Sequence, residues 1–171
     1  SPGPNVFLDC LAENALNFSG SHESWACGTL FDNVTINGND IRLSNIKTYS
    51  QGAGFSASNC VVWNCNASEI DVSDPPGSVN YIRGAVGRIV GDTEPVQPHR
   101  FYSTRSLYAT QLENRLGADK FKEVTAKAKV PSERPSKFVF DKRKVKGKPE
   151  VKKQKIEIIN GRFVCNGRVF W

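Results

Sequence analysis

The residues best suited to chemistry in this sequence lie in one short polar segment, Ser21-His22-Glu23-Ser24-Trp25. His22 is a candidate general acid or base, because an imidazole titrates near neutral pH. Glu23 is a candidate to orient that imidazole or to bind a cation, and an exposed Trp25 would stack on a sugar ring. His22 and Glu23 are neighbours, however, and an extended strand directs neighbouring side chains to opposite faces. We therefore favour the alternative, a polar loop that fixes itself to the next strand.

Two arginines, Arg42 and Arg83, form a second candidate group. A guanidinium can hold a carboxylate through two parallel hydrogen bonds, so outward-facing arginines on stacked strands would bind an acidic sugar. The alternative is ordinary solvated surface arginine. We expect Trp63 in the core rather than as a sugar platform, and His99 in a linker.

The sequence predicts no metal site, because neither histidine lies near a Cys-x-x-Cys pair. The number of cysteines is odd, so at least one must stay unpaired. We expect Cys10 and Cys65 to be stacked, buried thiols rather than partners in a disulfide. The five cysteines are Cys10, Cys27, Cys60, Cys65 and Cys165.

The elements that must position these residues come from a repeat. Three segments, 5–12, 28–35 and 60–67, each place two large apolar residues before Asp or Asn and then Cys or Asn, and this alignment puts Leu8, Phe31 and Trp63 in one column. A repeat of 20–30 residues in β-rich sequence is typical of a solenoid, whose equivalent positions stack at strand spacing. We predict a parallel β-helix over 1–105, with a sandwich of antiparallel strands as the alternative.

The rest of the chain divides into three parts. Ser106 is a helix cap and Gly117 a helix end, so 106–117 is predicted to be a helix that caps the solenoid. Segment 118–155 has 14 Lys and Arg against 5 Asp and Glu, which gives it a charge of +9 and leaves the remainder at −3. We interpret it as a basic, solvated linker rather than a nucleic-acid site, because aromatic residues are not interleaved with the lysines of 142–155. Two Asn-Gly pairs predict a hairpin or three-stranded meander over 156–171, or the start of a following domain.

Several motifs carry a resemblance to a known family. The runs NDIRLSN, GAGFSASNCVVWNCNAS, VSDPPGSVNYIRGAVG and PHRFYSTRSLYATQLENRLG resemble the C-terminal coils of secreted bacterial proteins of the pectate-lyase-like superfamily, over residues 5–117. The resemblance implies a partial right-handed parallel β-helix, a secreted or periplasmic location and polysaccharide as the partner. A solenoid with a bare end exposes its stacked interior, so we also expect the coil beginning at Asn5 to pack on N-terminal coils of the same protein that are missing here. No run of 18 apolar residues is present, so we expect no membrane span.

The resemblance implies activity less directly. Lyases of that superfamily remove the proton beside a uronate carboxylate, often with calcium as cofactor, whereas hydrolases on the same fold use neighbouring aspartates. This sequence has neither a calcium-ligand cluster nor a paired-aspartate motif, and its GAGFSAS loop lacks the histidine of closer relatives. Two hypotheses follow: a polysaccharide lyase acting on uronate-containing glycan, and a non-catalytic, glycan-binding or structural β-helix segment.

Overall fold

The computed structural model describes residues 3–22, 25–48, 52 and 54–126, together with the backbone of three strands near the C-terminus. The chain divides into two compact units, Ser1–Phe138 and Val139–Trp171.

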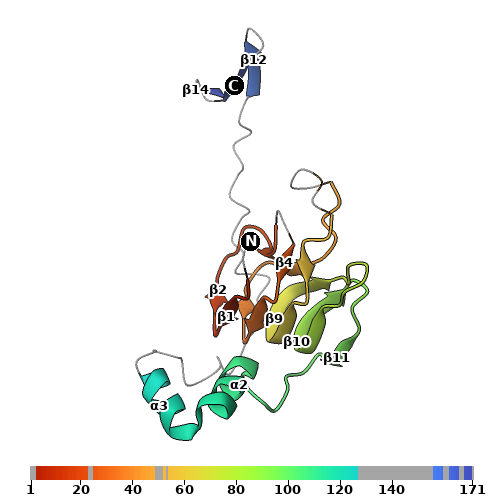
Figure 1. The fold of residues 1–171 in the computed structure, drawn as a ribbon. Coiled ribbons are helices and arrows are strands. Elements are labelled where there is room, and N and C mark those ends of the chain that lie inside the picture. Colours follow the sequence, from red (N-terminus) through yellow and green to blue (C-terminus); the bar gives the residue numbers. More distant parts are fainter. Residues whose placement is uncertain are drawn as a thin grey trace. The chain divides into compact units, whose positions relative to one another are not determined.

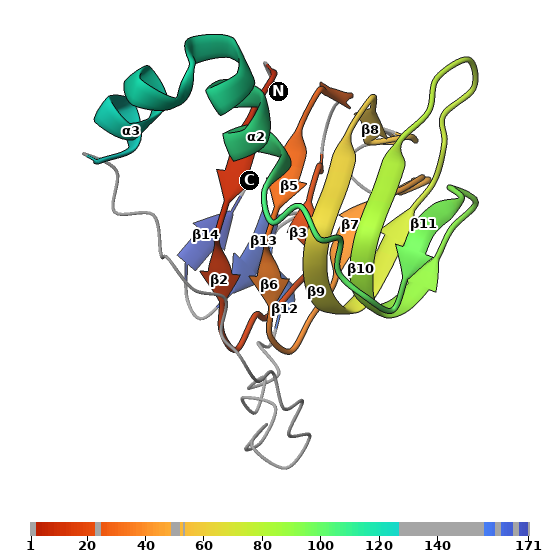
Figure 2. The ribbon, with the colours of Figure 1, turned by 90° about the horizontal axis from the view of Figure 1, so that it is seen from below.

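The first unit is mainly β, and its strands pair in parallel (Figure 1). One nine-stranded sheet contains β1, β5, β9, β10 and β11 in that order, with β2 on β6, β3 on β7, and both β6 and β7 on the long β9 (Figure 2). A separate two-stranded sheet joins β4 and β8. The strands are β1 (Val6–Leu8), β2 (Leu11–Ala12), β3 (Ser19–Gly20), β4 (Ala26–Cys27), β5 (Leu30–Asp32), β6 (Thr35–Ile36), β7 (Ile41–Leu43), β8 (Ala57–Ser58), β9 (Val61–Val72), β10 (Tyr81–Val90) and β11 (Pro95–Pro98).

The register of these strands corrects the alignment made from the sequence. Phe7 pairs with Phe31, Phe31 with Val62, and Val62 with Ile82, and the rings of Phe7 and Phe31 stack with centroids 5.1 Å apart. Leu8 instead lies in a column with Asp32 and Trp63. The middle copy of the repeat was therefore misplaced by one residue, which in a strand moves every side chain to the opposite face.

Trp63 lies outside the core, so the prediction that it belongs to the apolar stack is wrong. Its indole N–H donates to the Thr104 carbonyl at 3.2 Å, and its ring packs against Tyr102 with centroids 5.0 Å apart. The largest fully buried apolar side chains are inward ones of neighbouring strands, namely Ile41, Leu43, Val62, Ile70, Val72 and Ile82.

The bend that follows the first strand of each coil has the expected chemistry. Asp9, Asn33 and Asn64 have φ values of 50°, 56° and 52°, in the left-handed region that short polar side chains tolerate. Cys10 and Cys65 follow the first and third of these residues, as the repeat predicted. Cys65 is buried but Cys10 is exposed, so only one of the two thiols is in the core. All four cysteines whose side chains the structure describes are free.

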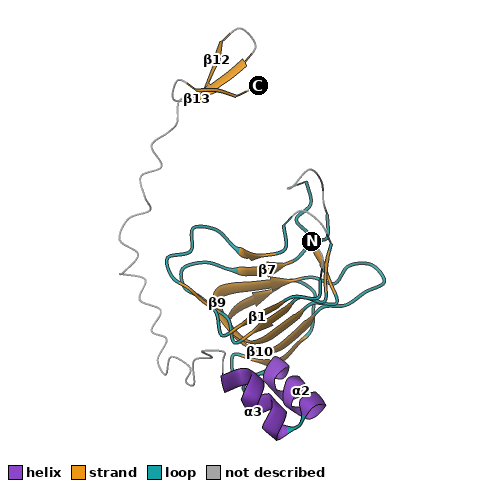
Figure 3. Cartoon of the chain, turned by 60° about the vertical axis from the view of Figure 1, so that its left-hand side comes forward, coloured by secondary structure: helices purple, strands orange, loops and turns teal. Residues whose placement is uncertain are grey.

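Two helices follow the strands and lie together beside them (Figure 3). α2 (Leu107–Leu116) falls within the predicted 106–117; Ala109 N donates to the Ser106 hydroxyl at 3.0 Å and Gly117 ends the helix. α3 (Ala118–Ala126) occupies the first nine residues of the predicted linker, which corrects that boundary. Asp119 in its first turn favours this helix through the helix dipole. The remainder of the linker lies outside the described residues.

The second unit contains an antiparallel sheet of β12 (Ile156–Ile159), β13 (Arg162–Cys165) and β14 (Arg168–Phe170), in agreement with the predicted meander. The Asn-Gly pairs between its strands lie outside the described residues. Among the helices that the structure describes, none has the length and apolar character needed to cross a membrane.

Candidate functional site

The main candidate site lies on the outward face of β3, β7 and the second half of β9. Arg42 is in register with Gly20 on one side and Asp71 on the other. Its neighbours Ile41 and Leu43 are fully buried, so strand alternation turns Arg42 away from the core. A Cβ on Gly20 would lie 1.9 Å from the Arg42 carbonyl oxygen, so glycine is what allows β3 to approach β7 here.

Two carboxylates hold the Arg42 guanidinium. Arg42 Nη2 lies 3.3 Å from Asp40 Oδ2, and Arg42 Nε lies 3.5 Å from Asp71 Oδ2. The Ser44 hydroxyl donates to the same Asp71 oxygen at 2.9 Å. The centre of this candidate site, formed by Arg42, Asp40, Asp71 and Ser44, therefore combines one cation, two anions and a hydroxyl. It offers both hydrogen-bond donors and acceptors to a ligand.

Phe18 brings His22 to this centre. The Arg42 Cζ atom lies 4.8 Å from the centroid of the Phe18 ring, a cation–π distance, and the His22 ring stacks on Phe18 with centroids 5.9 Å apart and an interplanar angle of 22°. His22 and Arg42 were separate candidates in the sequence. The structure joins them through one aromatic ring.

The other predicted site residues lie apart from this centre or outside the described residues. Trp25 is 51% exposed, as a sugar-stacking role requires. Glu23 lies outside the described residues. Arg83 is in register with Trp63 and Val96.

Arg42 is in register with Asp71 of β9, whereas Arg83 is in register with Trp63, which lies eight residues earlier in the same strand. The two arginines therefore do not form a clamp. Arg83 contacts its own strand instead: its guanidinium donates to the Ile82 carbonyl at 2.9 Å and lies 5.5 Å from the centroid of the Tyr81 ring. Residue type alone could not show that Arg42 on β7 and Arg83 on β10 pair with different parts of β9.

The calcium implied by the family resemblance does not fit these residues. Within the described part of the chain, no group of three or more His, Cys, Asp or Glu side chains is arranged to hold a metal ion. Asp40 and Asp71 both face Arg42, which already neutralises part of their charge. We accordingly derive no chemical step through a metal.

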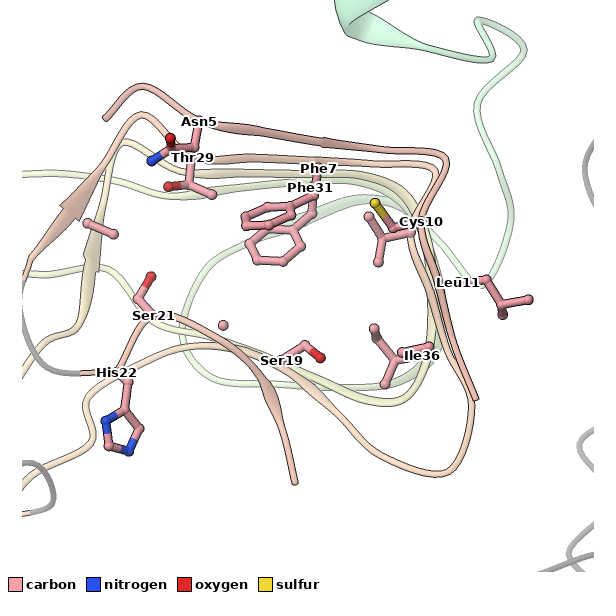
Figure 4. Close-up of a pocket in the computed structure, with 14 residues that line it drawn as sticks. Asn5, Phe7, Cys10, Leu11, Ser19, Ser21, His22, Thr29, Phe31 and Ile36 are labelled. Carbon is pink, nitrogen blue, oxygen red and sulfur yellow. The ribbon is translucent and has the colours of Figure 1, made fainter. Parts of the chain in front are cut away.

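A cavity of about 710 Å³ lies beside this site, at the end of the strand stack formed by β1, β2 and β3 (Figure 4). Phe7, Phe31 and Ile36 point into it, whereas His22 stands at its edge and points away. Among the described residues that line it there is no Asp, Glu, Lys or Arg; these residues are Asn5, Phe7, Cys10, Leu11, Ala12, Ser19, Gly20, Ser21, His22, Ala26, Thr29, Phe31, Val34 and Ile36.

Comparison of this chain with protein-family models, curated proteins and solved structures gives no match.

Sequence reasoning missed three members of the site: Phe18, Asp40 and Asp71. Asp40 could have been found, because it is two residues from Arg42 and alternate residues of a strand share a face. Asp71 required the correct register between β7 and β9. Phe18 was passed over because it precedes the strand in a polar segment, where nothing in the sequence indicates that its ring meets Arg42.

Asp32 is a further buried acid, and its contacts are structural. Its carboxylate accepts hydrogen bonds from the Ser106 hydroxyl at 2.7 Å and from the Tyr108 backbone N–H at 2.8 Å. Burial raises the pKa of Asp32 above its ordinary value, and the two hydrogen bonds oppose that shift only in part. The carboxylate is fully buried, so it cannot reach a ligand on the outward face.

Proposed function

We propose that this chain is part of a right-handed parallel β-helix that binds polysaccharide on the outward face of β3, β7 and β9. The observation that carries the proposal is the Phe18 ring, which contacts both Arg42 and His22 beside the Asp40 and Asp71 carboxylates. The β-helix itself is supported by the parallel, in-register strands and by the left-handed residues at the repeated bend.

A sugar matches this mixture of groups. Its C–H face packs on an aromatic ring, while its hydroxyls need acceptors such as Asp40 and Asp71 and donors such as Arg42. Trp25 supplies an exposed aromatic side chain, whereas Phe18 is half-buried. The face is not strongly positive, because Arg42 is paired with two carboxylates and Arg88 with Glu69. Hydroxyl recognition and ring stacking, rather than charge, should therefore dominate binding.

A second candidate function is a lyase acting on uronate-containing glycan, and the meeting of His22 and Arg42 at Phe18 favours it. In such a reaction the His22 imidazole would take the proton beside the uronate carboxylate, with Glu23 orienting it. The C–O bond to the leaving sugar would then break, its oxygen would take a proton from the His22 imidazolium or from water, and a double bond would remain in the product. Arg42 would neutralise the uronate carboxylate of the substrate. To do so it must exchange its ion pair with Asp40 or Asp71 for one with the substrate. This exchange is the reason that we place binding first.

The proposal has consequences for location and assembly. A polysaccharide partner favours a secreted or periplasmic protein. The cavity at β1–β3, whose described lining residues include no Asp, Glu, Lys or Arg, favours packing of this end on further coils of the same protein.

Binding is tested with a panel of neutral and uronate-containing oligosaccharides by isothermal titration calorimetry. Phe18→Ala and Trp25→Ala should each weaken the affinity by about 2- to 13-fold, the value of one stacking contact of about 0.5–1.5 kcal/mol. Val124→Thr on α3, another exposed apolar position, is the matched control and should bind as the parent does. Equal affinities in all four proteins, or no binding to any glycan, would exclude the site.

Lysis is tested separately, by following the ultraviolet absorbance of unsaturated product. A lyase should form product that His22→Ala abolishes while glycan binding persists. Binding without product from any uronate glycan would leave the non-catalytic function.

A further inference from the structure

The outward face around Arg42 offers a ligand hydrogen-bond acceptors rather than an open cation. Asp40 Oδ2 accepts from Arg42 Nη2 at 3.3 Å. Asp71 Oδ2 accepts from the Ser44 hydroxyl at 2.9 Å and faces Arg42 Nε. Within the described residues, neither carboxylate contacts a partner through its Oδ1 oxygen. Two carboxylate oxygens beside Arg42 are therefore left to accept hydrogen bonds from a ligand.

The Arg42 guanidinium is already engaged. A carboxylate binds a guanidinium best through two parallel hydrogen bonds. Each of the two edges of Arg42 that could donate such a pair includes Nη2, which donates to Asp40. In one of these edges the second nitrogen, Nε, lies 3.5 Å from Asp71 Oδ2. A uronate must therefore displace an aspartate of the protein to pair with Arg42, whereas a sugar hydroxyl can donate to either Oδ1 oxygen without displacing any group.

The charges of this face also oppose an acidic ligand. Along β3, β7 and the second halves of β9 and β10, the described outward side chains include more carboxylates than guanidinium groups. The three carboxylates belong to Asp40, Glu69 and Asp71, and the two guanidinium groups to Arg42 and Arg88. With histidine counted as neutral, these side chains sum to a charge of −1. The face repels a further carboxylate and is indifferent to an uncharged sugar.

These two properties separate neutral sugars from uronates. A uronate differs from the corresponding neutral sugar at C6, where a carboxylate replaces the hydroxymethyl group. The ionised carboxylate only accepts hydrogen bonds, so it cannot donate to the open oxygens of Asp40 and Asp71. It also brings a like charge close to both aspartates, and like-charge contacts discriminate against the wrong ligand.

We propose that Asp40 and Asp71 make this face selective for neutral polysaccharide and exclude uronate-containing glycan. The two carboxylates accept hydrogen bonds from the hydroxyls of a sugar that lies beside Phe18, and they keep Arg42 from pairing with an acidic group. The inference rests on the glycan binding proposed above, whose substrate class it names, and it opposes the lyase function.

Oligosaccharides that differ only at C6 test this selectivity. Hexasaccharides of β-1,4-linked glucose, β-1,4-linked mannose and α-1,4-linked galactose are titrated into the full chain by calorimetry, each beside the corresponding uronate hexasaccharide. In the pair that binds, the neutral member should bind about tenfold more tightly, which is the effect of one unfavourable charge–charge interaction at a partly exposed site.

Uronate bound elsewhere on the chain must be separated from uronate bound at this face. Segment 118–155 has 14 Lys and Arg against 5 Asp and Glu, so it can attract an acidic glycan by itself. Only the part of uronate binding that Phe18→Ala weakens is therefore assigned to the face around Arg42.

Substitution of the aspartates should move the two ligands in opposite directions. Asp71→Asn and Asp40→Asn each remove one negative charge at nearly constant side-chain size, so uronate should bind about tenfold more tightly than to the parent. Neutral glycan should bind about two- to fivefold more weakly, because an amide oxygen accepts a weaker hydrogen bond than a carboxylate. A purely structural loss would weaken both ligands. Asp40→Asn serves alone if Asp71→Asn does not fold.

Glu113→Gln is the matched control, because it removes one negative charge from the exposed surface of α2 and should change neither affinity. A similar gain in uronate affinity in this variant would show that overall charge controls selectivity, and would overturn the proposal. Uronate that binds the parent face as tightly as its neutral counterpart, or no better in either Asn variant, also overturns it and leaves glycan binding in place. Failure of all six hexasaccharides to bind overturns it as well, and the wider glycan panel then decides the proposed function separately.

Discussion

The Asp32 carboxylate and the Ser106 hydroxyl lie 2.7 Å apart and join the end of β5 to the cap of α2. The same carboxylate accepts from Tyr108 N, in the first turn of the helix, where the helix dipole favours a negative charge. Arg105 donates to Asp9, one strand further along the stack, at 2.6 Å. These contacts hold the start of α2 beside β1 and β5. α2 therefore does not lie over the end of the stack that follows β11, where we expected the helix that caps the solenoid.

Removing the Asp32 carboxylate should loosen the helix from the strands. Asp32→Ala leaves the Ser106 hydroxyl and Tyr108 N–H without their acceptor, and we expect the free energy of unfolding to fall by about 1–3 kcal/mol. Urea denaturation followed by circular dichroism measures the change. Gln111→Ala, on the exposed surface of α2, is the control and should change stability by less than about 0.5 kcal/mol. Similar losses in the two variants would contradict a specific role for Asp32.

The contribution of Asp32 to the free energy of unfolding should also depend on pH. Burial raises the pKa of Asp32 in the folded protein above its unfolded value near 4. The folded state therefore holds this proton more tightly than the unfolded state, and the resulting stability is full below the unfolded pKa and is lost as pH rises through the folded pKa. The difference in unfolding free energy between the parent and Asp32→Ala should decrease from about pH 4 upward. Urea titrations at several pH values measure it, and a difference that grows with pH would contradict the assignment.

The sequence predicts those parts of the fold that depend on neighbouring residues within one copy of the repeat. The column that joins Cys10 to Cys65 and the polar bends at Asp9 and Asn64 follow from the residues alone. The middle copy was misplaced because Phe31-Asp32-Asn33 contains two polar residues that could each serve as the bend. Only the backbone, which gives Asn33 the left-handed φ, distinguishes them.

The candidate site was partly predictable for the same reason. His22 and Arg42 were identified by residue type, but their meeting depends on the direction of the Phe18 ring. The docking of α2 was not predictable, since Asp32 and Ser106 are 74 residues apart and neither residue type indicates the other as its partner. Contacts of this kind are set by packing rather than by a local pattern.

The cysteines should separate into two classes by reactivity. Cys10 and Cys27 are exposed, whereas Cys60 and Cys65 are buried, and burial raises the pKa of Cys65 to about 12. At pH 8 the thiolate fraction of Cys65 is then on the order of 10⁻⁴, and the thiolate is the reactive form. In a Cys165→Ser variant, which removes the thiol that lies outside the described residues, Ellman's reagent should label two thiols quickly and the other two only after urea is added. Four fast thiols would show that the core around Cys65 is open.

Gly84 in β10 should tolerate substitution poorly. Its φ is 65°, and an added Cβ would lie 2.4 Å from Asn64 Oδ1 and 2.8 Å from Tyr102 N. Asn64 Oδ1 accepts a hydrogen bond from Tyr102 N at 2.6 Å, so Gly84→Ala would disturb the contact that ties the segment before α2 to β9. Gly77 has a φ of 78° but open space around it, so Gly77→Ala carries the backbone strain alone, about 1–2 kcal/mol. Gly84→Ala should therefore destabilise the chain by more than Gly77→Ala in parallel urea denaturation. Equal losses would mean that the Asn64–Tyr102 contact yields to the added methyl group without a measurable loss of stability.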